Sequence, residues 1–155
     1  MKNAKNRRIL VVLGVLLLAL PIMPLSSCRA GKVGLFDARL QGCSSKPNCV
    51  CSEYPGERAY IDPLSFEGDP DAAFRKLITF LEEQPRVELV TVENHYVHAV
   101  FTTLIMRFRD DVEFRLDRQA NLIHVRSASR VGYSDLGKNR DRVEWLRKRW
   151  SSSSS

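Results

Sequence analysis

The sequence predicts an α+β fold in which an antiparallel β-meander of about four or five strands packs against two helices, in the order β-α-β-β-β-β-α. Three observations indicate this fold. A capped amphipathic helix follows residue 69, strand-like segments separated by turns run from residue 86 to residue 127, and a basic helix comes last. Consecutive hairpins with helices before and after them are typical of an antiparallel sheet with its helices on one face.

The first helix is marked at both ends. A short strand is expected at residues 60–64, and Asp69 then provides an N-cap for a helix that begins with Pro70. Apolar residues recur at helical spacing and predict one buried face: Ala73, Phe74, Leu77, Ile78 and Leu81. Pro85 ends this helix, because proline lacks the backbone N–H that a helix interior needs.

The strands follow as a series of hairpins. Residues 86–93 and 95–103 are rich in Val, Leu, Tyr, Phe and Thr, which favours two strands joined by a tight turn. Residues 112–117 alternate between apolar and charged side chains, as a half-exposed antiparallel strand does, and residues 122–127 form the next strand. The last helix is expected to bury one face made of Leu136, Val143, Leu146 and Trp150.

The composition divides the chain into four parts. Residues 1–27 are expected to form a lipoprotein-type signal peptide and residues 28–59 a tether with a disulfide-pinned loop. Residues 60–150 are expected to form a single α+β domain, and residues 151–155 a disordered serine tail. The third part is long enough for one modest hydrophobic core.

The N-terminal residues predict export and lipid attachment. A basic segment containing Lys2, Lys5, Arg7 and Arg8 precedes a short apolar run at residues 9–20, the arrangement of a signal peptide. Leu25-Ser26-Ser27-Cys28 then resembles a bacterial lipobox, which implies cleavage before Cys28 and acylation of that cysteine with chains such as palmitate. An uncleaved anchor and an ordinary signal peptide are the alternatives, and Arg7-Arg8 leaves twin-arginine export open.

The expected location follows from this segment. Several acyl chains give a lasting anchor, so the domain is expected in the cell envelope, lipid-anchored to a membrane and facing the periplasm or the exterior. The whole chain has 24 Lys and Arg against 18 Asp and Glu, a formal net charge of +6. Four of these basic residues and no acidic ones precede Cys28, which leaves 20 against 18, or +2. The basic excess therefore belongs largely to the export signal, and no nucleic-acid partner is expected.

The remaining cysteines fit an oxidising compartment. Cys43 and Cys49 flank a turn-rich segment that can bring their Cα atoms within bridging range. Cys49 and Cys51 are separated by one residue and point to the same side of an extended chain, where they are too far apart to bridge without strain. A metal site is the alternative, but no fourth ligand lies at a zinc-like spacing. We expect a Cys43–Cys49 disulfide, a free Cys51, no metal and no cofactor.

Four motifs resemble a known family. LFDARLQGCSSKPNCVCSE, YIDPLSFEGDPDAAF, FRDDVEFRLD and IHVRSASRVGYSDLGKNRDRVE together are similar to the bacterial and plastid family catalogued as domain of unknown function 1499, from about residue 34 to residue 149. The family pattern falls on Cys43, Pro47, Asn48, Cys49, Asp110, Asp111, Glu113, Arg126, Ser127, Ser129, Arg130, Gly132, Tyr133, Ser134, Asp135, Asn139, Arg140 and Glu144. Cys51 departs from it, which supports Cys43 with Cys49 as the pair. The resemblance implies a fold and an extent but no reaction.

The last motif supplies a candidate ligand-binding corner between the final strand and the final helix. Its members are Arg126, Ser127, Ser129, Arg130, Tyr133, Ser134, Asp135, Asn139 and Arg140, with Asp110 and Asp111 as counter-charges. Arginines beside a helix N-terminus suit a phosphate or a carboxylate. The alternative is structural, with the arginines paired to aspartates and Ser134 or Asp135 capping the helix.

Other chemistry is less well supported. Asp110 and Asp111 point to opposite faces of a strand, so they cannot line one catalytic site, whereas Asp111 and Glu113 share a face that Arg126 can pair with. The three histidines have no metal-like spacing and are expected in surface or cross-strand packing. Ser134 has no assignable base, so a hydrolase is a minor alternative.

The sequence therefore predicts a non-catalytic binding module of the envelope, with a protein or a small anionic ligand as its possible partner. A carrier of a small anionic or lipid-like ligand is the second possibility. A pocket under the sheet would favour the carrier, and an exposed polar groove would favour the module.

Overall fold

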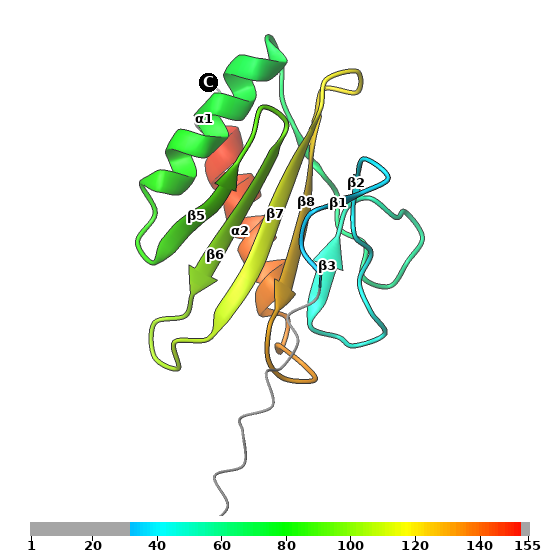
Figure 1. Ribbon diagram of the computed structural model, residues 1–155, viewed down its shortest axis with the longest axis vertical. Helices are drawn as coiled ribbons and strands as arrows, with labels where there is room; N and C mark the ends of the chain where they lie inside the picture. Colours follow the sequence, from blue (N-terminus) through cyan, green and yellow to red (C-terminus); the bar gives the residue numbers. More distant parts are fainter. Residues whose placement is uncertain (1–31, 153–155) are drawn as a thin grey trace, which may run out of the picture.

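An antiparallel sheet with two helices on one face organises residues 32–152, the part of the chain that the computed structural model describes (Figure 1). The elements are β1 Leu35–Phe36, β2 Arg39–Leu40, β3 Cys49–Cys51, β4 Leu64–Ser65, α1 Pro70–Glu82, β5 Val87–Val92, β6 Tyr96–Thr102, β7 Arg109–Asp117, β8 Leu122–Ser129 and α2 Lys138–Ser152. The main sheet has the order β3-β8-β7-β6-β5, with β4 also paired to β8, and β1 pairs with β2 separately.

The α+β class and the two helices are confirmed, but the predicted strand count is wrong. Residues 32–152 form eight strands instead of four or five. Three of the additional strands, β1, β2 and β3, lie within residues 28–59, and β3 joins the main sheet through β8. These strands are two or three residues long, too short to carry the alternating pattern by which a strand is recognised in sequence.

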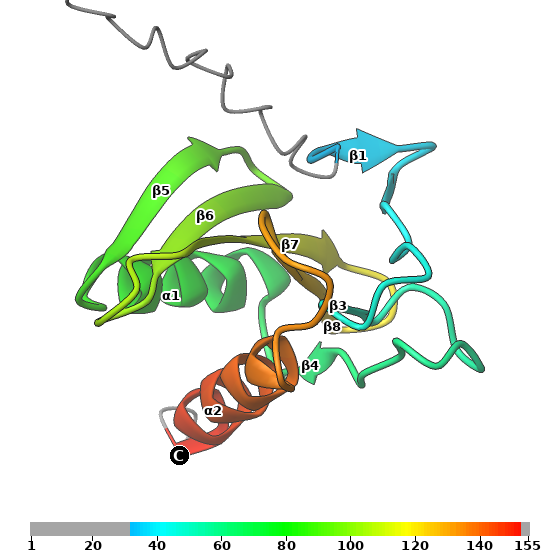
Figure 2. The ribbon, with the colours of Figure 1, turned by 90° about the horizontal axis from the view of Figure 1, so that it is seen from below.

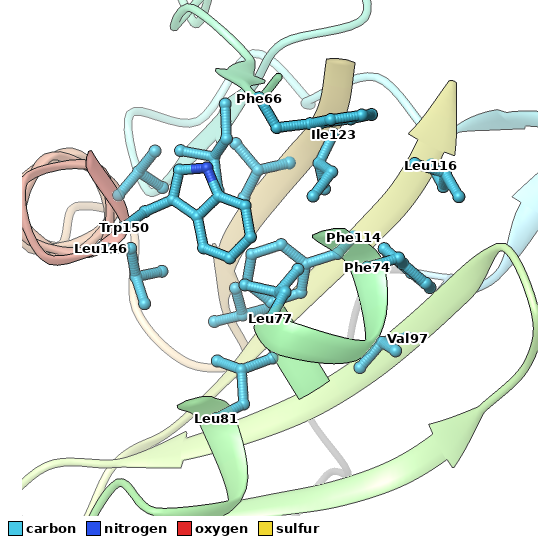
Figure 3. Packing of buried hydrophobic residues seen from close by; sticks show 14 of the residues in the cluster. Phe66, Phe74, Leu77, Leu81, Val97, Phe114, Leu116, Ile123, Leu146 and Trp150 are labelled. Atoms are coloured by element: carbon cyan, nitrogen blue, oxygen red, sulfur yellow. The ribbon is translucent and has the colours of Figure 1, made fainter. Parts of the chain in front are cut away.

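The helix α1 begins and ends close to the expected residues. Asp69 is its N-cap, and the side chain of Asp69 accepts a 2.6 Å hydrogen bond from the backbone N–H of Ala72. One face of α1 places Phe74, Leu77 and Leu81 against the sheet (Figure 3). The main core thus lies between the helices and one face of the sheet.

The helix α2 starts later than expected. Val143, Leu146 and Trp150 enter the main core, whereas Leu136 lies in the preceding loop and is 89% exposed. The prediction that Leu136 belongs to the buried face is wrong, because the backbone carbonyl and carboxylate of Asp135 already accept hydrogen bonds from the first N–H groups of α2. The other end of α2 runs through Ser152, so the first two residues of the predicted serine tail are helical.

The second face of the sheet is covered by the N-terminal strands. Figure 2 shows α1 and α2 on one side of the sheet and β1 on the other. A small apolar cluster of Leu40, Cys51 and Tyr96 anchors this cover. The N-terminal strands exclude water from this face but contribute few apolar side chains to it. Charged residues of β7 and β8, such as Glu113 and Arg126, are therefore buried beneath these strands.

Two predictions concern residues outside the described range. The signal peptide and Cys28 lie among residues 1–31, and the end of the serine tail lies at residues 153–155. Within residues 32–152, neither helix combines the length and the apolar character needed to cross a bilayer.

Candidate functional site

A buried ion pair stands at the centre of the second face of the sheet. Glu113 of β7 is 0% exposed and Arg126 of β8 is 4% exposed, and the two are cross-strand partners. Arg126 Nη1 donates to Glu113 Oε2 at 2.6 Å, while the Tyr96 hydroxyl and the Gly34 N–H donate to Glu113 Oε1 at 2.8 and 2.7 Å. The predicted pairing of this strand face with Arg126 is confirmed. Burial and the neighbouring Glu113 raise the pKa of Tyr96, which keeps its hydroxyl a donor.

A second carboxylate on this face has a histidine and an arginine as neighbours. Asp111 is buried, and its carboxylate lies 2.8 Å from His98 Nε2 and accepts hydrogen bonds from Arg130 Nε and Nη2 at 2.7–3.1 Å. Burial opposes ionisation of Asp111, but the hydrogen bonds from His98 and Arg130 outweigh burial and lower its pKa. His98 is thus in cross-strand packing, as expected.

A third cluster lies toward the other end of the same face. Glu53 is buried and accepts hydrogen bonds from Arg115 Nε at 2.6 Å and Arg39 Nε at 3.1 Å, with His124 Nδ1 3.8 Å away. Burial alone would raise the pKa of Glu53, but the hydrogen bond from Arg115 and the charge of His124 lower it overall. Glu53 lies in a segment without periodicity, so the sequence carried no signal that it would be buried.

Stability should fall in acid because of Glu53. Since the pKa of Glu53 is lower in the folded chain, its stabilisation is fully present above the ordinary glutamate pKa of about 4.3 and is lost as the pH falls through the folded value. Glu53→Gln should therefore lower the unfolding free energy by about 2 kcal/mol at pH 7 and by much less near pH 3. Urea melts of both proteins at several pH values measure this gap, and a gap independent of pH would contradict the assignment.

The polar residues of the last motif that face the helices form a separate network around Asn139. Asn139 is fully buried, and its Nδ2 donates to the Asn48 carbonyl, to Ser129 Oγ and to Asp135 Oδ2 at 2.7–3.0 Å. Its Oδ1 accepts from Ser127 Oγ at 2.6 Å. The network joins β3, β8 and the start of α2, which makes it a structural joint.

Asp110 belongs to this helix-facing side. Arg142 of α2 donates to the Asp110 carboxylate and, at 2.9 Å, to Ser127 Oγ. Asp110 was expected to pair with an arginine of the motif at residues 126–140, and the sequence pattern does not single out Arg142. Helical periodicity marks a face by its apolar residues, so a half-buried arginine beside Val143 and Leu146 is not distinguished from a surface one.

The expected single corner is therefore divided between two faces of the sheet, because adjacent residues on a strand point to opposite sides. Arg126, Arg130 and Asp111 lie on the second face, and Ser127, Ser129, Asp110, Asp135 and Asn139 lie on the helix face. Tyr133, Ser134 and Arg140 are exposed. Arg140 donates to the Tyr60 carbonyl at 2.7 Å, and Ser134 Oγ accepts from the Leu136 N–H at 3.3 Å.

The predicted disulfide is confirmed. Cys43 and Cys49 are bridged, with their Cα atoms 5.7 Å apart, and Cys51 is a free, buried thiol. Burial raises the pKa of Cys51 to about 11, so the thiolate is disfavoured at neutral pH. Within residues 32–152 no three His, Cys, Asp or Glu side chains gather as a metal site would require.

Removing this disulfide should cost stability. The bond closes a loop with a sequence separation of six, which constrains the unfolded chain by about 2 kcal/mol. A Cys43→Ser/Cys49→Ser double variant should lose about that much unfolding free energy in urea melts. Ser44→Ala, an exposed change inside the same loop, is the control and should leave the melt unchanged. Equal melts for all three proteins would contradict the prediction.

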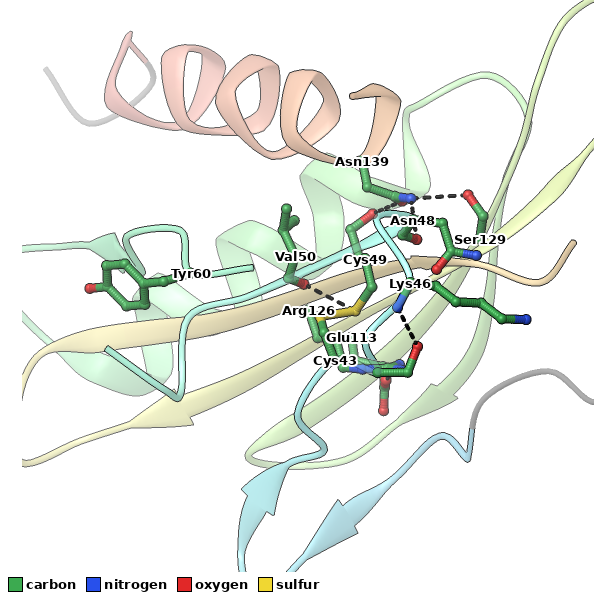
Figure 4. The surroundings of a disulfide bond; sticks show 12 residues. Cys43, Lys46, Asn48, Cys49, Val50, Tyr60, Glu113, Arg126, Ser129 and Asn139 are labelled. Carbon is green, nitrogen blue, oxygen red and sulfur yellow. Dashed lines mark hydrogen bonds and ion pairs between the residues drawn. A yellow bond between two sulfur atoms is a disulfide. The ribbon is translucent and has the colours of Figure 1, made fainter. Parts of the chain in front are cut away.

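A cleft of about 450 Å³ lies beside the disulfide. Its walls are Gln41, Gly42, Cys43, Ser44, Lys46, Asn48, Cys49, Arg126, Ala128, Ser129, Arg130 and Gly132. In the described part of the chain the walls hold three cationic side chains and no carboxylate. Figure 4 shows Arg126 and Glu113 directly beside the Cys43–Cys49 bond, with Lys46 extending from the same loop.

Several polar groups of the cleft residues have no partner among residues 32–152. Arg126 Nε and Gln41 Oε1 are buried atoms without a hydrogen bond. Arg130 uses Nε and Nη2 on Asp111, and no contact of its Nη1 is found. An unsatisfied buried donor or acceptor costs about 1–3 kcal/mol, so this cleft is the part of the molecule best prepared to gain from a polar ligand.

Residues 39–149 match the model of a protein family described as "Protein of unknown function (DUF1499)". No curated protein matched the chain, and neither did a solved structure. The matched range includes β2 to nearly the end of α2, and with them the disulfide, the cleft and both polar networks.

Proposed function

The chain belongs to this family of proteins of unknown function, and we propose that it is a lipid-anchored binding module of the cell envelope whose cleft holds a small anionic group. The observation that carries the proposal is the composition of the cleft walls. Arg126, Arg130 and Lys46 surround it without a carboxylate among the described wall residues, and Arg126 Nε lacks a partner.

The hydrogen-bond donors of the cleft and the charge of Lys46 favour an anion. The charges of Arg126 and Arg130 are largely neutralised by Glu113 and Asp111, which lie behind them in the sheet. The guanidinium groups are held in place by these carboxylates and still have N–H groups to donate. Lys46 adds a positive charge at the exposed rim, since its side chain has no ion-pair partner among residues 32–152. A carboxylate or a phosphate matches such a set of donors.

The same walls also offer an acceptor. Gln41 Oε1 is buried and unpaired, so a ligand that brings a hydroxyl or ammonium donor next to its anionic group would satisfy both kinds of orphaned atom. A monoprotonated phosphate ester, a hydroxy acid and an amino acid all have this chemistry. Binding, rather than hydrolysis, is supported by the positions of the histidines. His98 and His124 interact with Asp111 and Ser52 on the sheet and are not among the cleft walls.

The anchor is supported by the basic segment, the apolar run at residues 9–20 and the Leu25-Ser26-Ser27-Cys28 box. An oxidising location agrees with a disulfide that pins the cleft wall. The anchor is tested by growing cells with a fatty-acid analogue and following label in the wild-type chain and in Cys28→Ser. The wild-type chain should take up the label and Cys28→Ser should not. A wild-type chain without label would reject the anchor.

Binding is tested by calorimetric titration of the full-length protein in detergent with inorganic phosphate and, separately, with serine and malate. Lys46→Glu should weaken the binding of whichever probe binds by about tenfold, because it replaces an attractive charge at the rim with a repulsive one. Lys148→Glu, the same charge change on α2 away from the cleft, is the control and should bind as the wild type does. Equal losses in both variants, or no binding of any probe, would reject the proposed site.

A further inference from the structure

Large apolar side chains are exposed together at one end of the molecule. The turn between β6 and β7 exposes Leu104, Ile105, Met106 and Phe108, and Ile105 reaches 85%. The loop between β8 and α2 adds Val131, Tyr133 and Leu136. These two loops are neighbours, because Asp110 at the start of β7 pairs with Ser129 at the end of β8. Figure 1 shows both loops at the lower end of the sheet.

This concentration is unusual for a surface that meets only water. Seven of the twelve large apolar side chains that residues 32–152 expose belong to these two loops. Scattered exposed apolar residues are ordinary, whereas a contiguous group marks an interaction surface. The group sits at the tip of a hairpin and on an adjacent loop, so it projects beyond the strands and is not a groove that would receive a helix or a strand.

The charge around the turn is positive. Arg107 lies within the turn and Arg109 follows it, and Arg86 is close because its carbonyl accepts a 2.9 Å hydrogen bond from the Thr102 N–H. Arg109 pairs with Glu88 at 3.0 Å, whereas the exposed side chains of Arg86 and Arg107 have no partner among residues 32–152.

The opposite end of the sheet has a mixed charge. Its turns and the start of α1 present Glu67, Asp69, Asp71, Glu93 and Asp117, with Arg118 paired to Asp71 at 2.6 Å. The C-terminal half of α2, which contains Arg147, Lys148 and Arg149, ends at the same place (Figure 1), because Trp150 lines one pocket with Glu67 and Asp69. The apolar turn with its basic residues is therefore the end of the described molecule that an anionic, partly apolar surface would attract.

The proposed lipid anchor brings the apolar end within reach of a bilayer. The Gly34 N–H is fixed to Glu113 in the middle of β7 at 2.7 Å. From Glu113 to Phe108 the chain advances five residues, about 17 Å at roughly 3.3 Å per strand residue. From Gly34 back to Cys28 there are six residues, which span at most about 20 Å. An acylated Cys28 thus allows the tip of the β6–β7 turn to rest on the membrane that holds the lipid.

We propose that this end is a membrane-docking surface, defined by Leu104, Ile105, Met106 and Phe108 with Arg86 and Arg107. The apolar tip enters the interfacial layer of the bilayer, and the two arginines contact anionic headgroups. The inference rests on the proposed lipid anchor, and it assigns the domain an orientation that the anchor alone does not specify. The combination of an apolar tip with basic residues is the arrangement by which peripheral domains bind anionic interfaces.

The test uses the full-length protein reconstituted in vesicles of phosphatidylglycerol and brominated phosphatidylcholine, whose bromines quench nearby tryptophan. Ile105→Trp places a reporter at the tip, and Asn94→Trp places one in the exposed turn at the opposite end of the sheet. The parent chain gives the contribution of Trp145 and Trp150. The added emission of Ile105→Trp should be quenched at least about threefold more than that of Asn94→Trp, and adding Arg107→Glu to Ile105→Trp should reduce the quenching.

Vesicle flotation of the same samples separates the two proposals. Flotation with selective quenching at residue 105 supports docking. Flotation with no quenching, or with equal quenching at residues 94 and 105, overturns docking and leaves the anchor intact. A protein that does not float overturns the anchor and the docking together. Thermal melts that match the parent chain establish that both exposed substitutions leave the fold unchanged.

Discussion

Replacing Glu113 by alanine should destabilise the domain by about 3–5 kcal/mol, because it leaves the buried guanidinium of Arg126 without its counter-charge. The same change removes the acceptor of the Tyr96 hydroxyl and of the Gly34 N–H, so the N-terminal cover should loosen as well. Glu113→Gln keeps an acceptor but no charge and should lie between the wild type and alanine. Urea denaturation followed by circular dichroism measures all three.

The matched control is the exposed pair between Glu88 of β5 and Arg109 of β7, which also joins a carboxylate and an arginine of two strands. Glu88→Ala should change the unfolding free energy by less than about 1 kcal/mol, since solvent screens exposed pairs. A loss for Glu113→Ala that is no larger than the loss for Glu88→Ala would show that the buried pair does not contribute as its burial implies.

Replacing Asn139 by leucine should cost about 3 kcal/mol. More than one buried group loses its partner, among them the Asn48 carbonyl and Ser127 Oγ, and each such loss costs about 1–3 kcal/mol. The effect should appear as a lower denaturation midpoint and as faster hydrogen exchange in β3, which depends on this joint for one end.

Arg140→Ala is the control for the leucine substitution. Arg140 neighbours Asn139 on α2 but is exposed and makes a single hydrogen bond to the Tyr60 carbonyl, so its loss should cost less than about 1 kcal/mol. If both variants melt alike, the Asn139 network is not the structural joint described here.

These two results bear on the meaning of the long motif at residues 126–140. Ser127, Ser129, Asp135 and Asn139 join β8 to α2. Arg126 and Arg130 are held by carboxylates of β7. Much of the motif is therefore explained by the fold. The part that remains for a ligand is the cleft, where Arg126, Ser129 and Arg130 meet the disulfide loop.

Some features could be read from the amino-acid sequence because they depend on neighbouring residues. The N-cap at Asp69, the buried stripe of α1 and the hairpin strands follow from local patterns that tertiary contacts do not override. The Cys43–Cys49 pair follows from the length of one loop. The pairing of Glu113 with Arg126 could be predicted because side chains alternate between the two faces of a strand, which determines that these two residues share one face of the sheet.

Other features depended on which distant segments meet, and only the tertiary structure decided them. Glu53, Arg115 and His124 come from three separate segments, and Asn48 meets Asn139 from 91 residues away. The short strands β1, β2 and β3 exist because β7 and β8 offer them a surface and pairing partners, not because of their own propensity. The cleft lies at the same contact, where the disulfide loop packs against the end of β8. There Arg126 Nε is buried without a partner among residues 32–152, because its surroundings come from segments remote in sequence.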